Sequence, residues 1–374
     1  MNKRVMVGMS GGVDSSVTAY LLSQQGYEVI GVTMQVWHDE EECRRLDQLA
    51  ARQPDCGCVD RDEIAAAKIC EYLGIPHYTV YYRDVFRREV ISDFVEEYLR
   101  GRTPNPCVRC NRYVKWDMLL KAAQEHGADW IATGHYGRVL QLENGRYTVS
   151  NSASADKDQT YVLYRLTQEQ LSHALMPLGE YDKPAVRRIA AQAGIPSAAQ
   201  KDSQDACFAE GVEGGYAAFL EQEAPGRIPP PGRFRTSDGQ DLGEHRGITH
   251  YTIGQRKRLG ISLGHRAVVT AIHPQDNTVV IGRDEDVYSD QLVCRDLNFL
   301  GMDPDEFGIG ESRDVTAKIR YAHRGAPCTM TRTGPDEITC RFREKVRAVT
   351  PGQSCVFYEG GCEHGYVLGG GIIQ

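Results

Sequence analysis

Three cysteines lie where thiol chemistry is possible. Cys107 and Cys110 form a C-x-x-C pair inside R-T-P-N-P-C-V-R-C-N, and Cys207 lies inside K-D-S-Q-D-A-C-F. The two prolines place the pair at the start of a helix. There the helix dipole, with Arg109 and Arg112 nearby, is expected to lower a thiol pKa and make the thiolate available. By itself a C-x-x-C pair indicates a redox motif, half of a metal site, or chance.

A glycine-rich turn supplies a second candidate site. Residues 10–16 read S-G-G-V-D-S-S and lie between a predicted strand and a predicted helix. Two glycines let a ligand approach the backbone, and the following helix presents N–H groups and the positive end of its dipole. The motif is neither the Walker P-loop nor G-x-G-x-x-G. A capped turn is the alternative, but the full motif after a strand favours a site for nucleotide phosphates.

The elements around these motifs alternate between strand and helix in the first half of the chain. This pattern predicts a parallel sheet with helices on both faces and ligands at the carboxyl ends of its strands. Asn144-Gly145 predicts a hairpin turn, with helices near 168–175 and 183–194. The predicted strands are 4–9, 27–37, 77–82 and 130–135, and the predicted helices are 15–25, 60–73, 84–99 and 115–126.

The character of the sequence changes after residue 208. A proline-rich stretch and short β-like runs separated by turns replace the alternating pattern. Such a pattern predicts a closed barrel or a sandwich at the C-terminus. We expect domains at 1–208, 209–283 and 284–374. The expected strands of the last two are 278–281, 315–320, 338–342, 354–358 and 366–373.

Length and composition bound the class of protein. The 374 residues favour two or three domains, and 41% hydrophobic with 25% charged residues is typical of a globular protein. Apolar runs stay well below the roughly 18 residues of a membrane span, and the N-terminal apolar stretch is interrupted too early for a signal peptide. We expect a cytoplasmic protein without a membrane partner.

The net charge of −8 is distributed unevenly. The window 313–347 holds nine Lys or Arg and four Asp or Glu, and a second basic run is 256–258. An acidic total disfavours non-specific binding of nucleic acid. A local basic face fits a folded RNA held at one place, and it equally fits a solvated β-surface.

Seven sequence blocks occur in a fixed order and resemble a known family. They are G-M-S-G-G-V-D-S-S, R-T-P-N-P-C-V-R-C-N, A-T-G-H-Y, K-D-Q-T-Y-V-L-Y-R-L, K-D-S-Q-D-A-C-F, Y-T-I-G-Q-R-K-R-L-G and K-I-R-Y. Together they resemble the tRNA-specific 2-thiouridylases of the pyrophosphate-loop ATPase superfamily, over nearly the whole chain. The resemblance implies a Rossmann-like pyrophosphate-loop domain, a small central domain and a C-terminal β-barrel. It also implies an enzyme that adenylates the carbon-2 oxygen of the wobble uridine with ATP and Mg²⁺, and then replaces that oxygen with sulfur.

The resemblance also implies roles for individual residues. Cys110 would be the nucleophile and Cys207 the persulfide carrier, the two being able to form a disulfide, and Asp14 would join them in catalysis. ATP would bind at Gly8, Met9, Ser10, Gly11, Gly12, Val13, Asp14 and Ser15, with Met34 against the adenine and Gly134 beside the nucleotide. The tRNA would contact Asn105, Pro106 and Cys107 near the target base, and His135, Lys157, Asp158, Gln159, Arg320, Tyr321 and Gln353 elsewhere. The implied partners are tRNAs for Lys, Glu and Gln and a cysteine desulfurase or sulfur-relay protein.

One position departs from the family pattern. The best-known members have Asp where this chain has Cys107. Cys107, Cys110 and Cys207 could therefore hold a 4Fe–4S cluster with one iron left open. The alternatives are persulfide chemistry, for which Cys110 and Cys207 are enough, and a Cys107 that merely packs. We favour the persulfide route.

The remaining cysteines carry no expected function. Cys56-Gly57-Cys58, with Cys43 and Cys70, lacks a standard zinc spacing, so incidental thiols are favoured over a metal site or sulfur relay. Those of the β-rich part are expected to pack as small hydrophobic residues; they are Cys294, Cys328, Cys340, Cys355 and Cys362.

Two other functions compete with thiolation. An amide-forming pyrophosphate-loop synthetase would use the same turn without needing Cys110 or Cys207. An RNA-binding or iron–sulfur carrier protein with a degenerate loop is the alternative outside enzymes, and the intact S-G-G-V-D-S argues against it.

Overall fold

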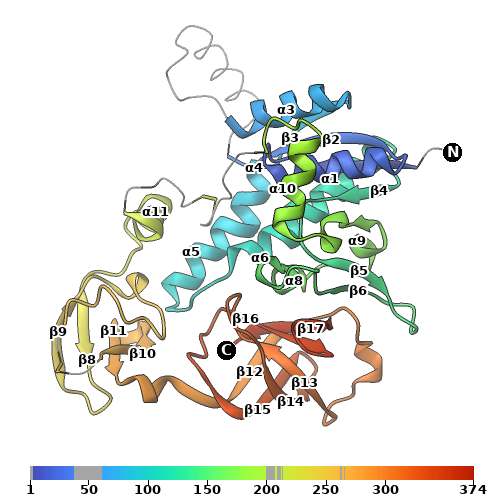
Figure 1. The fold of residues 1–374 in the computed structure, drawn as a ribbon. Coiled ribbons are helices and arrows are strands. Elements are labelled where there is room, and N and C mark those ends of the chain that lie inside the picture. Colours follow the sequence, from blue (N-terminus) through green and yellow to red (C-terminus); the bar gives the residue numbers. More distant parts are fainter. Residues whose placement is uncertain are drawn as a thin grey trace, which may run out of the picture. The chain divides into compact units, whose positions relative to one another are not determined.

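The computed structural model describes residues 3–37, 61–198, 207–208, 212, 214–261, 263–264 and 266–374. The chain divides into two compact units, which are described separately (Figure 1). The first unit comprises Met1–Val90, Val108–Ser203 and Glu363–Val367. The second comprises Ile91–Cys107, Gln204–Cys362 and Leu368–Gln374.

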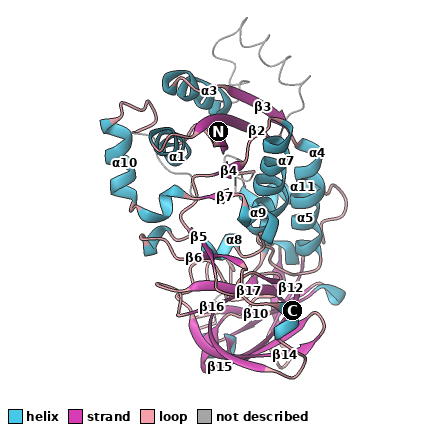
Figure 2. Ribbon diagram, turned by 90° about the vertical axis from the view of Figure 1, so that its right-hand side faces the viewer, coloured by secondary structure: helices cyan, strands magenta, loops and turns pink. Residues whose placement is uncertain are grey.

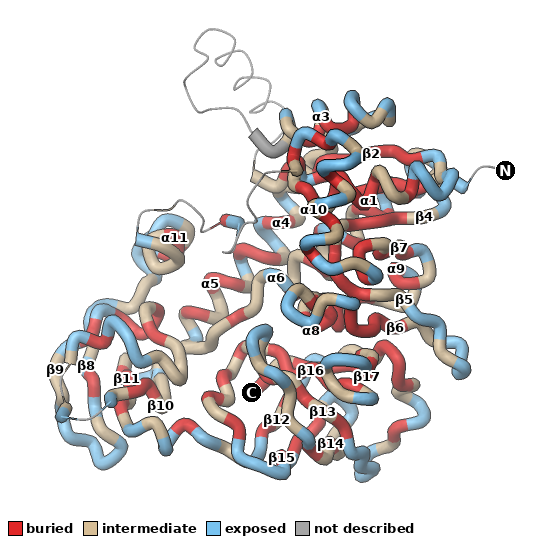
Figure 3. Tube along the Cα trace, in the orientation of Figure 1, coloured by how far each residue is buried: buried red, intermediate tan, exposed pale blue. Residues whose placement is uncertain are grey.

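A five-stranded parallel sheet forms the centre of the first unit. Its strand order is β3-β2-β1-β4-β7, so β1 lies between β2 on one side and β4 on the other. Apolar runs bury the middle strands on both faces, as parallel sheets require, and the buried stretches are visible in Figure 3. The strands are β1 (Arg4–Gly8), β2 (Glu28–Gln35), β3 (His77–Tyr81), β4 (Trp130–Ala132) and β7 (Ala174–Leu175).

Helices cover the sheet, which confirms the predicted α/β class (Figure 2). Helix α1 packs against α10 through an apolar cluster that includes Val17 and Val186, and α7 packs against β1 and β4. Asp182 caps α10 by accepting a hydrogen bond from the Ala185 N–H at 2.7 Å. The helices are α1 (Val13–Gln24), α3 (Arg61–Leu73), α4 (Arg83–Phe86), α6 (Pro106–Cys110), α7 (Asp117–Glu125), α8 (Thr160–Leu163), α9 (Gln168–Ser172) and α10 (Lys183–Gln192), with α5 (Ser92–Leu99) and α11 (Gly215–Glu223) in the second unit.

Three segments differ from the sequence prediction. The helix expected over 84–99 contains a π-helical segment, Arg87–Ile91, between α4 and α5. The strand expected over 130–135 ends at Ala132. The helix expected over 168–175 ends at Ser172, because Ala174 and Leu175 pair with β4 instead. A two-residue strand has no periodicity of its own, so only the pairing partner reveals it.

The predicted hairpin is confirmed in the first unit. Strands β5 (Arg138–Gln141) and β6 (Tyr147–Ser150) pair on either side of the Asn144-Gly145 turn. Tyr366 pairs with Ser150, and the Thr148 hydroxyl donates to the Val367 carbonyl at 2.5 Å. These contacts explain why a short stretch near the C-terminus belongs to the first unit.

A closed six-stranded barrel forms the last part of the second unit. Its order is β12-β15-β14-β13-β16-β17, and pairing of β12 with β17 closes it, which settles the predicted choice between barrel and sandwich. A barrel has no unpaired edge strand. The strands are β12 (Tyr288–Phe299), β13 (Ser312–Lys318), β14 (Ala326–Gly334), β15 (Glu337–Arg347), β16 (Ser354–Glu359) and β17 (Tyr366–Ile373).

Four cysteines lie in the barrel interior, as predicted. Cys294, Cys328, Cys340 and Cys355 are buried and reduced. Burial raises the pKa of Cys340 and of Cys355 well above the usual range, so these thiols are neutral and pack like small hydrophobic residues. Cys362 is only partly buried.

A smaller four-stranded sheet precedes the barrel. Its order is β10-β11-β8-β9, and its core includes Phe234, Val269 and Val279. The strands are β8 (Gly232–Arg235), β9 (Asp241–His245), β10 (Val268–His273) and β11 (Thr278–Gly282). Among the residues described, no helix is long and apolar enough to cross a membrane.

Candidate active site

The glycine-rich turn joins the end of β1 to the start of α1. Gly11 has φ +75°, a conformation that favours glycine, and Gly12 is the N-cap of α1. The Ser10 N–H donates to the Ser15 hydroxyl at 3.2 Å, and the Ser16 hydroxyl donates to the Gly12 carbonyl at 2.7 Å. The result is a compact loop that presents the N-terminus of α1 at the carboxyl end of β1, a position suited to binding an anion.

The turn follows β1, the strand at which the sheet begins to grow in the opposite direction: β2 and β3 lie on one side of it, and β4 and β7 lie on the other. Gly8 ends β1 and pairs with Val32, two residues before Met34 at the end of β2. On the other side of β1, the segment after β4 brings Gly134 so close that a Cβ there would lie 2.9 Å from the Asp14 Cβ. Ligands bind at such switch points in open α/β sheets. The structure therefore brings the predicted ATP-binding residues together.

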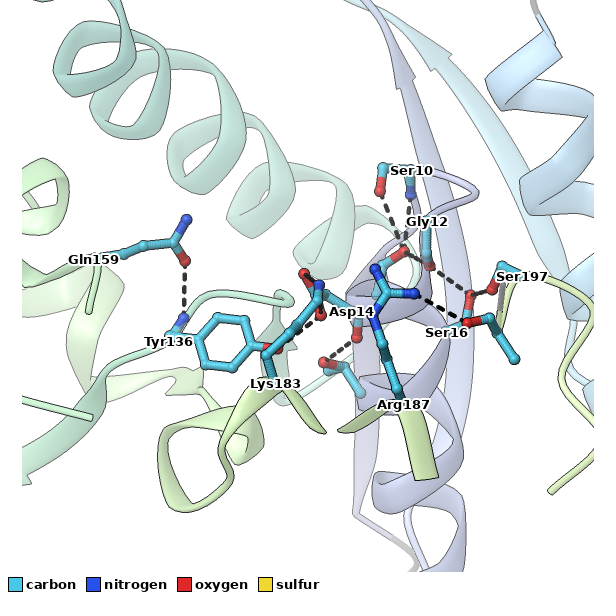
Figure 4. Close-up of polar contacts among 12 residues, drawn as sticks. Ser10, Gly12, Asp14, Ser16, Tyr136, Gln159, Lys183, Arg187 and Ser197 are labelled. Atoms are coloured by element: carbon cyan, nitrogen blue, oxygen red, sulfur yellow. Dashed lines mark hydrogen bonds and ion pairs between the residues drawn. The ribbon is translucent and has the colours of Figure 1, made fainter. Parts of the chain in front are cut away.

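Asp14 is the centre of a polar network that the sequence did not reveal (Figure 4). The Lys183 ammonium lies 2.8 Å from both carboxylate oxygens of Asp14, and the Tyr136 hydroxyl donates to Asp14 Oδ1 at 2.8 Å. The Lys183 side chain is only 11% exposed, and that of Asp14 is 32% exposed. An ammonium group paired with an accessible carboxylate at this turn can meet the charge of a phosphate chain.

Local signals for the two missed residues were weak. Tyr136 closes the A-T-G-H-Y block, and Lys183 follows the helix cap Asp182. A further contact holds the end of this region to α1: the Ser197 hydroxyl donates to the Ser16 hydroxyl at 3.1 Å (Figure 4).

Two of the predicted tRNA-contacting side chains are largely buried in the first unit. His135 is 8% exposed, stacks on Trp116 and hydrogen-bonds Thr133 at 2.7 Å. Burial, with Lys115 nearby, lowers the pKa of His135 to about 3, so its ring is neutral at physiological pH. The buried Asp158 carboxylate accepts from the Ser152 N–H and from Thr160.

Lys157 and Gln159 are partly exposed beside these residues. The 157–159 segment therefore offers Lys157 and Gln159 to a partner, while Asp158 holds the turn internally.

The helix that carries the C-x-x-C pair is short and continues into a π-helical segment, Asn111–Trp116. Cys107 is exposed, Cys110 is partly exposed, and both are reduced. Arg109 pairs with Glu89 and Arg112 with Asp117 at 2.9 Å. These carboxylates partly neutralise the cations that the sequence led us to expect would activate a thiolate.

The segment before the C-x-x-C pair is anchored within the second unit. The Gln353 amide donates to the carbonyls of Thr103 and Pro104, both at 3.0 Å. The Thr103 N–H donates to the Pro351 carbonyl at 2.8 Å. Gln353 thus fixes the backbone that leads to Asn105 and Pro106, the predicted neighbours of the target base.

Cys207 lies in the second unit next to an aromatic anchor. Its side chain is exposed and reduced. Phe208 is 6% exposed and packs against Phe94 and Phe219 with ring centroids 4.9 Å away in each case. An exposed thiol beside a buried ring is accessible to another protein at a defined place.

The basic window of the sequence maps to strands β13 to β15 of the barrel. Arg341, Arg343 and Lys345 are exposed on β15. Tyr321 is 46% exposed, and the Arg320 guanidinium donates to the Arg347 carbonyl at 2.8 Å. The Lys318 ammonium lies 5.9 Å from the centre of the Tyr321 ring. A cation beside an exposed tyrosine is suited to a nucleic-acid backbone and a base.

The cysteines at positions 43, 56, 58 and 70 form no metal site among the residues described. Cys43, Cys56 and Cys58 lie outside them, and burial raises the pKa of Cys70 to about 11. No group of three or more His, Cys, Asp or Glu able to hold a metal ion occurs in the described ranges.

Three family models match the chain in succession. The one described as the tRNA methyl transferase HUP domain matches residues 3–211. The tRNA methyl transferase PRC-barrel domain matches residues 217–283, and the aminomethyltransferase beta-barrel domain matches residues 289–373.

Full-length relatives carry one shared name. The tRNA-specific 2-thiouridylase MnmA of Lachnoclostridium phytofermentans is 48% identical over 371 residues, covering 99% of each chain. The protein of that name from Clostridioides difficile is 45% identical, covering 100% of this chain and 99% of its own. MnmA 1 of Caldanaerobacter subterraneus subsp. tengcongensis is 47% identical, covering 100% of this chain and 98% of its own. The chain therefore belongs to the tRNA-specific 2-thiouridylase family.

Proposed function

We propose that the protein is an ATP-dependent sulfurtransferase that converts the wobble uridine of tRNA to 2-thiouridine. The observation that carries the proposal is the intact pyrophosphate loop, with the Lys183 ammonium paired to Asp14, in a chain that also holds Cys110 and Cys207. An amide-forming synthetase of the same superfamily would have no use for those two cysteines. We expect the protein to work in the cytoplasm, with tRNA and ATP.

The first step activates a poor leaving group. The uridine carbon-2 oxygen attacks the α-phosphorus of ATP, pyrophosphate leaves, and the oxygen becomes part of an adenylate. The loop N–H groups and Lys183 stabilise the negative charge that develops on the phosphates. Residues Gly8 to Ser15, Met34 and Gly134 hold the nucleotide.

Magnesium is the expected companion of the phosphates. The Asp14 carboxylate is one-third exposed at the loop, and its Oδ2, whose contact is with Lys183, keeps a lone pair for the ion, whereas Oδ1 contacts both Lys183 and Tyr136. Asp14 would hold Mg²⁺, which supplies charge neutralisation at the phosphates.

The second step transfers sulfur from a persulfide on Cys207. Its terminal sulfur attacks carbon-2 and AMP leaves with the original oxygen. The Cys110 thiolate then attacks the Cys207 sulfur, which breaks the S–S bond and releases the thiolated tRNA. The products are a Cys110–Cys207 disulfide and 2-thiouridine, and a thiol reductant restores both cysteines.

The partners follow from this chemistry. A cysteine desulfurase or sulfur-relay protein loads the exposed thiol of Cys207. The tRNA, of the Lys, Glu and Gln acceptor types, contacts the barrel at Arg320 and Tyr321. The target uridine lies at Asn105, Pro106 and Cys107.

Reconstitution tests the proposal. The protein is incubated with an unmodified tRNA transcript bearing uridine at the wobble position, ATP, Mg²⁺, cysteine and a cysteine desulfurase. The expected result is 2-thiouridine in nuclease digests and AMP released only with tRNA. AMP release that needs ammonia or an amino acid instead would favour the amide synthetase, and tRNA binding without AMP would favour an RNA-binding protein.

Iron analysis separates the persulfide route from a cluster on Cys107, Cys110 and Cys207. The protein and its Cys107→Ala variant are purified without oxygen, and iron and acid-labile sulfide are measured. The persulfide route predicts neither in stoichiometric amount. About four irons and four sulfides per chain, lost in the variant, would replace the persulfide with a 4Fe–4S route.

A Gln353→Ala substitution is expected to lower kcat/KM for tRNA thiolation by about tenfold to a hundredfold. Its amide holds the Thr103 and Pro104 carbonyls, so its loss releases the backbone next to the target base. Single-turnover thiolation kinetics measure the effect. The exposed barrel glutamine Gln291→Ala is the control. Equal rates for the two variants would contradict an anchoring role for Gln353.

A further inference from the structure

Tyr136 is buried between two functional segments of the first unit. Its side chain is 2% exposed, and its hydroxyl donates to Asp14 Oδ1 at 2.8 Å. The same oxygen lies 2.8 Å from the Lys183 ammonium. Figure 4 shows the ring reaching from its backbone toward the pyrophosphate loop. The hydroxyl therefore shares with Lys183 the task of orienting the Asp14 carboxylate.

The backbone of Tyr136 is held from the opposite direction by Gln159. The Tyr136 N–H donates to Gln159 Oε1 at 2.9 Å, and the Gln159 N–H donates to the Tyr136 carbonyl at 2.9 Å. The side-chain bond is drawn in Figure 4. A displacement of Gln159 would therefore disturb both backbone hydrogen bonds of Tyr136, the one that its N–H donates and the one that its carbonyl accepts.

The 157–159 segment is a built turn rather than a loose loop. The buried Asp158 carboxylate accepts from the Ser152 N–H at 2.9 Å and from the Thr160 N–H at 3.2 Å. On the loop side, Gly134 lies directly against Asp14, as the 2.9 Å approach of a Cβ built there shows. Both ends of the connection are therefore firmly packed, and Tyr136 joins them, through its backbone to Gln159 and through its hydroxyl to Asp14.

We propose that Tyr136 is a positioning residue that couples tRNA contact at residues 157–159 to the orientation of Asp14 in the ATP site. The inference rests on the proposed function, because it takes the 157–159 segment as part of the tRNA interface. Contact of tRNA with Gln159 changes the hydrogen bonds of the Tyr136 peptide, and the hydroxyl passes that change to the carboxylate. Productive placement of Asp14 and Lys183 around the nucleotide then depends on bound tRNA, so the α-phosphorus is held for attack only when the uridine that accepts the adenylyl group is bound.

Thermodynamic linkage between tRNA binding and nucleotide binding allows the coupling to be measured without catalysis. If tRNA tightens nucleotide binding by a factor, nucleotide must tighten tRNA binding by the same factor. The probes are a wobble-uridine tRNA transcript and α,β-methylene-ATP, which cannot be cleaved between its α and β phosphates. Dissociation constants of each are measured with and without the other, using the full-length protein.

Tyr136→Phe is the decisive variant, because it removes only the hydroxyl. A hydrogen bond to a charged group supports an expected drop of about tenfold in the coupling factor, and a second assay is expected to show a lower kcat/KM for ATP in tRNA-dependent AMP release. Gln159→Leu, which removes the acceptor of the Tyr136 N–H, is expected to lower the same factor. Tyr181→Phe is the matched control, since it takes a hydroxyl from the same apolar cluster and leaves the Asp14 contact intact.

The outcomes are distinct. A coupling factor in Tyr136→Phe equal to that of the wild type would overturn the proposal, as would a wild-type factor of one. A loss of folding would be visible as a fall in the melting temperature, and Gln159→Leu then provides the independent test. Wild-type protein that binds neither probe, or that thiolates no tRNA, would instead refute the proposed function itself.

Discussion

Replacement of Cys207 by serine is expected to lower 2-thiouridine formation by at least about a thousandfold, the scale seen when a nucleophile is removed. A serine hydroxyl cannot carry a persulfide, so the sulfur has no attachment point. Adenylation does not use this thiol, so tRNA-dependent AMP release is expected to continue. Parallel assays of 2-thiouridine by mass spectrometry and of AMP by chromatography measure the two steps.

Cys110→Ser is expected to stop the same reaction at a later point. Without the Cys110 thiolate, the bond between Cys207 and the transferred sulfur persists, and the tRNA stays attached to the protein until an external thiol cleaves it. Denaturing gels with and without reductant detect that adduct. Cys362→Ser, which alters a partly buried barrel cysteine, is the control. Multiple-turnover thiolation by the Cys207 variant, or the absence of a reductant-sensitive adduct in the Cys110 variant, would contradict the assigned roles.

Replacement of Lys183 by methionine is expected to lower kcat/KM for ATP in tRNA-dependent AMP release by about a hundredfold to a thousandfold. The ammonium group lies 2.8 Å from Asp14 and is largely shielded from water. Methionine keeps the length of the side chain and removes the charge, so the phosphates lose a cation where the dielectric constant is low. Initial rates over a range of ATP concentrations separate the effect on KM from that on kcat.

Two further variants test whether the effect comes from the charge of Lys183. Lys183→Arg keeps the charge and is expected to recover part of the activity, whereas Lys121→Met, on the exposed surface of α7, is expected to behave as wild type. The Lys183 substitution also leaves Asp14 without its ion-pair partner, so thermal unfolding is measured alongside. A kcat/KM for ATP within threefold of the wild type would show that the pair is structural only.

The sequence was sufficient where the chemistry lies in contiguous motifs. The pyrophosphate loop between a strand and a helix, the hairpin at Asn144-Gly145 and the buried barrel cysteines all occur where the patterns predicted them. These features depend on local turn geometry and on the period of hydrophobic residues, and both can be read over a few positions. The helix expected over 60–73, observed as Arg61–Leu73, was found for the same reason, whereas the one expected over 84–99 is interrupted at Arg87–Ile91.

Only the tertiary structure decided which residues act together. Lys183 and Tyr136 reach Asp14 across 169 and 122 positions of the chain, and Gln353 reaches Thr103 across 250. Packing also buried His135, for which the family resemblance implied a contact with tRNA. Such pairings are set by how the sheet, helices and barrel pack, and no local pattern records them. The sequence by itself therefore determined the chemical groups available to this protein, whereas the fold decided which charges and hydrogen bonds surround each group.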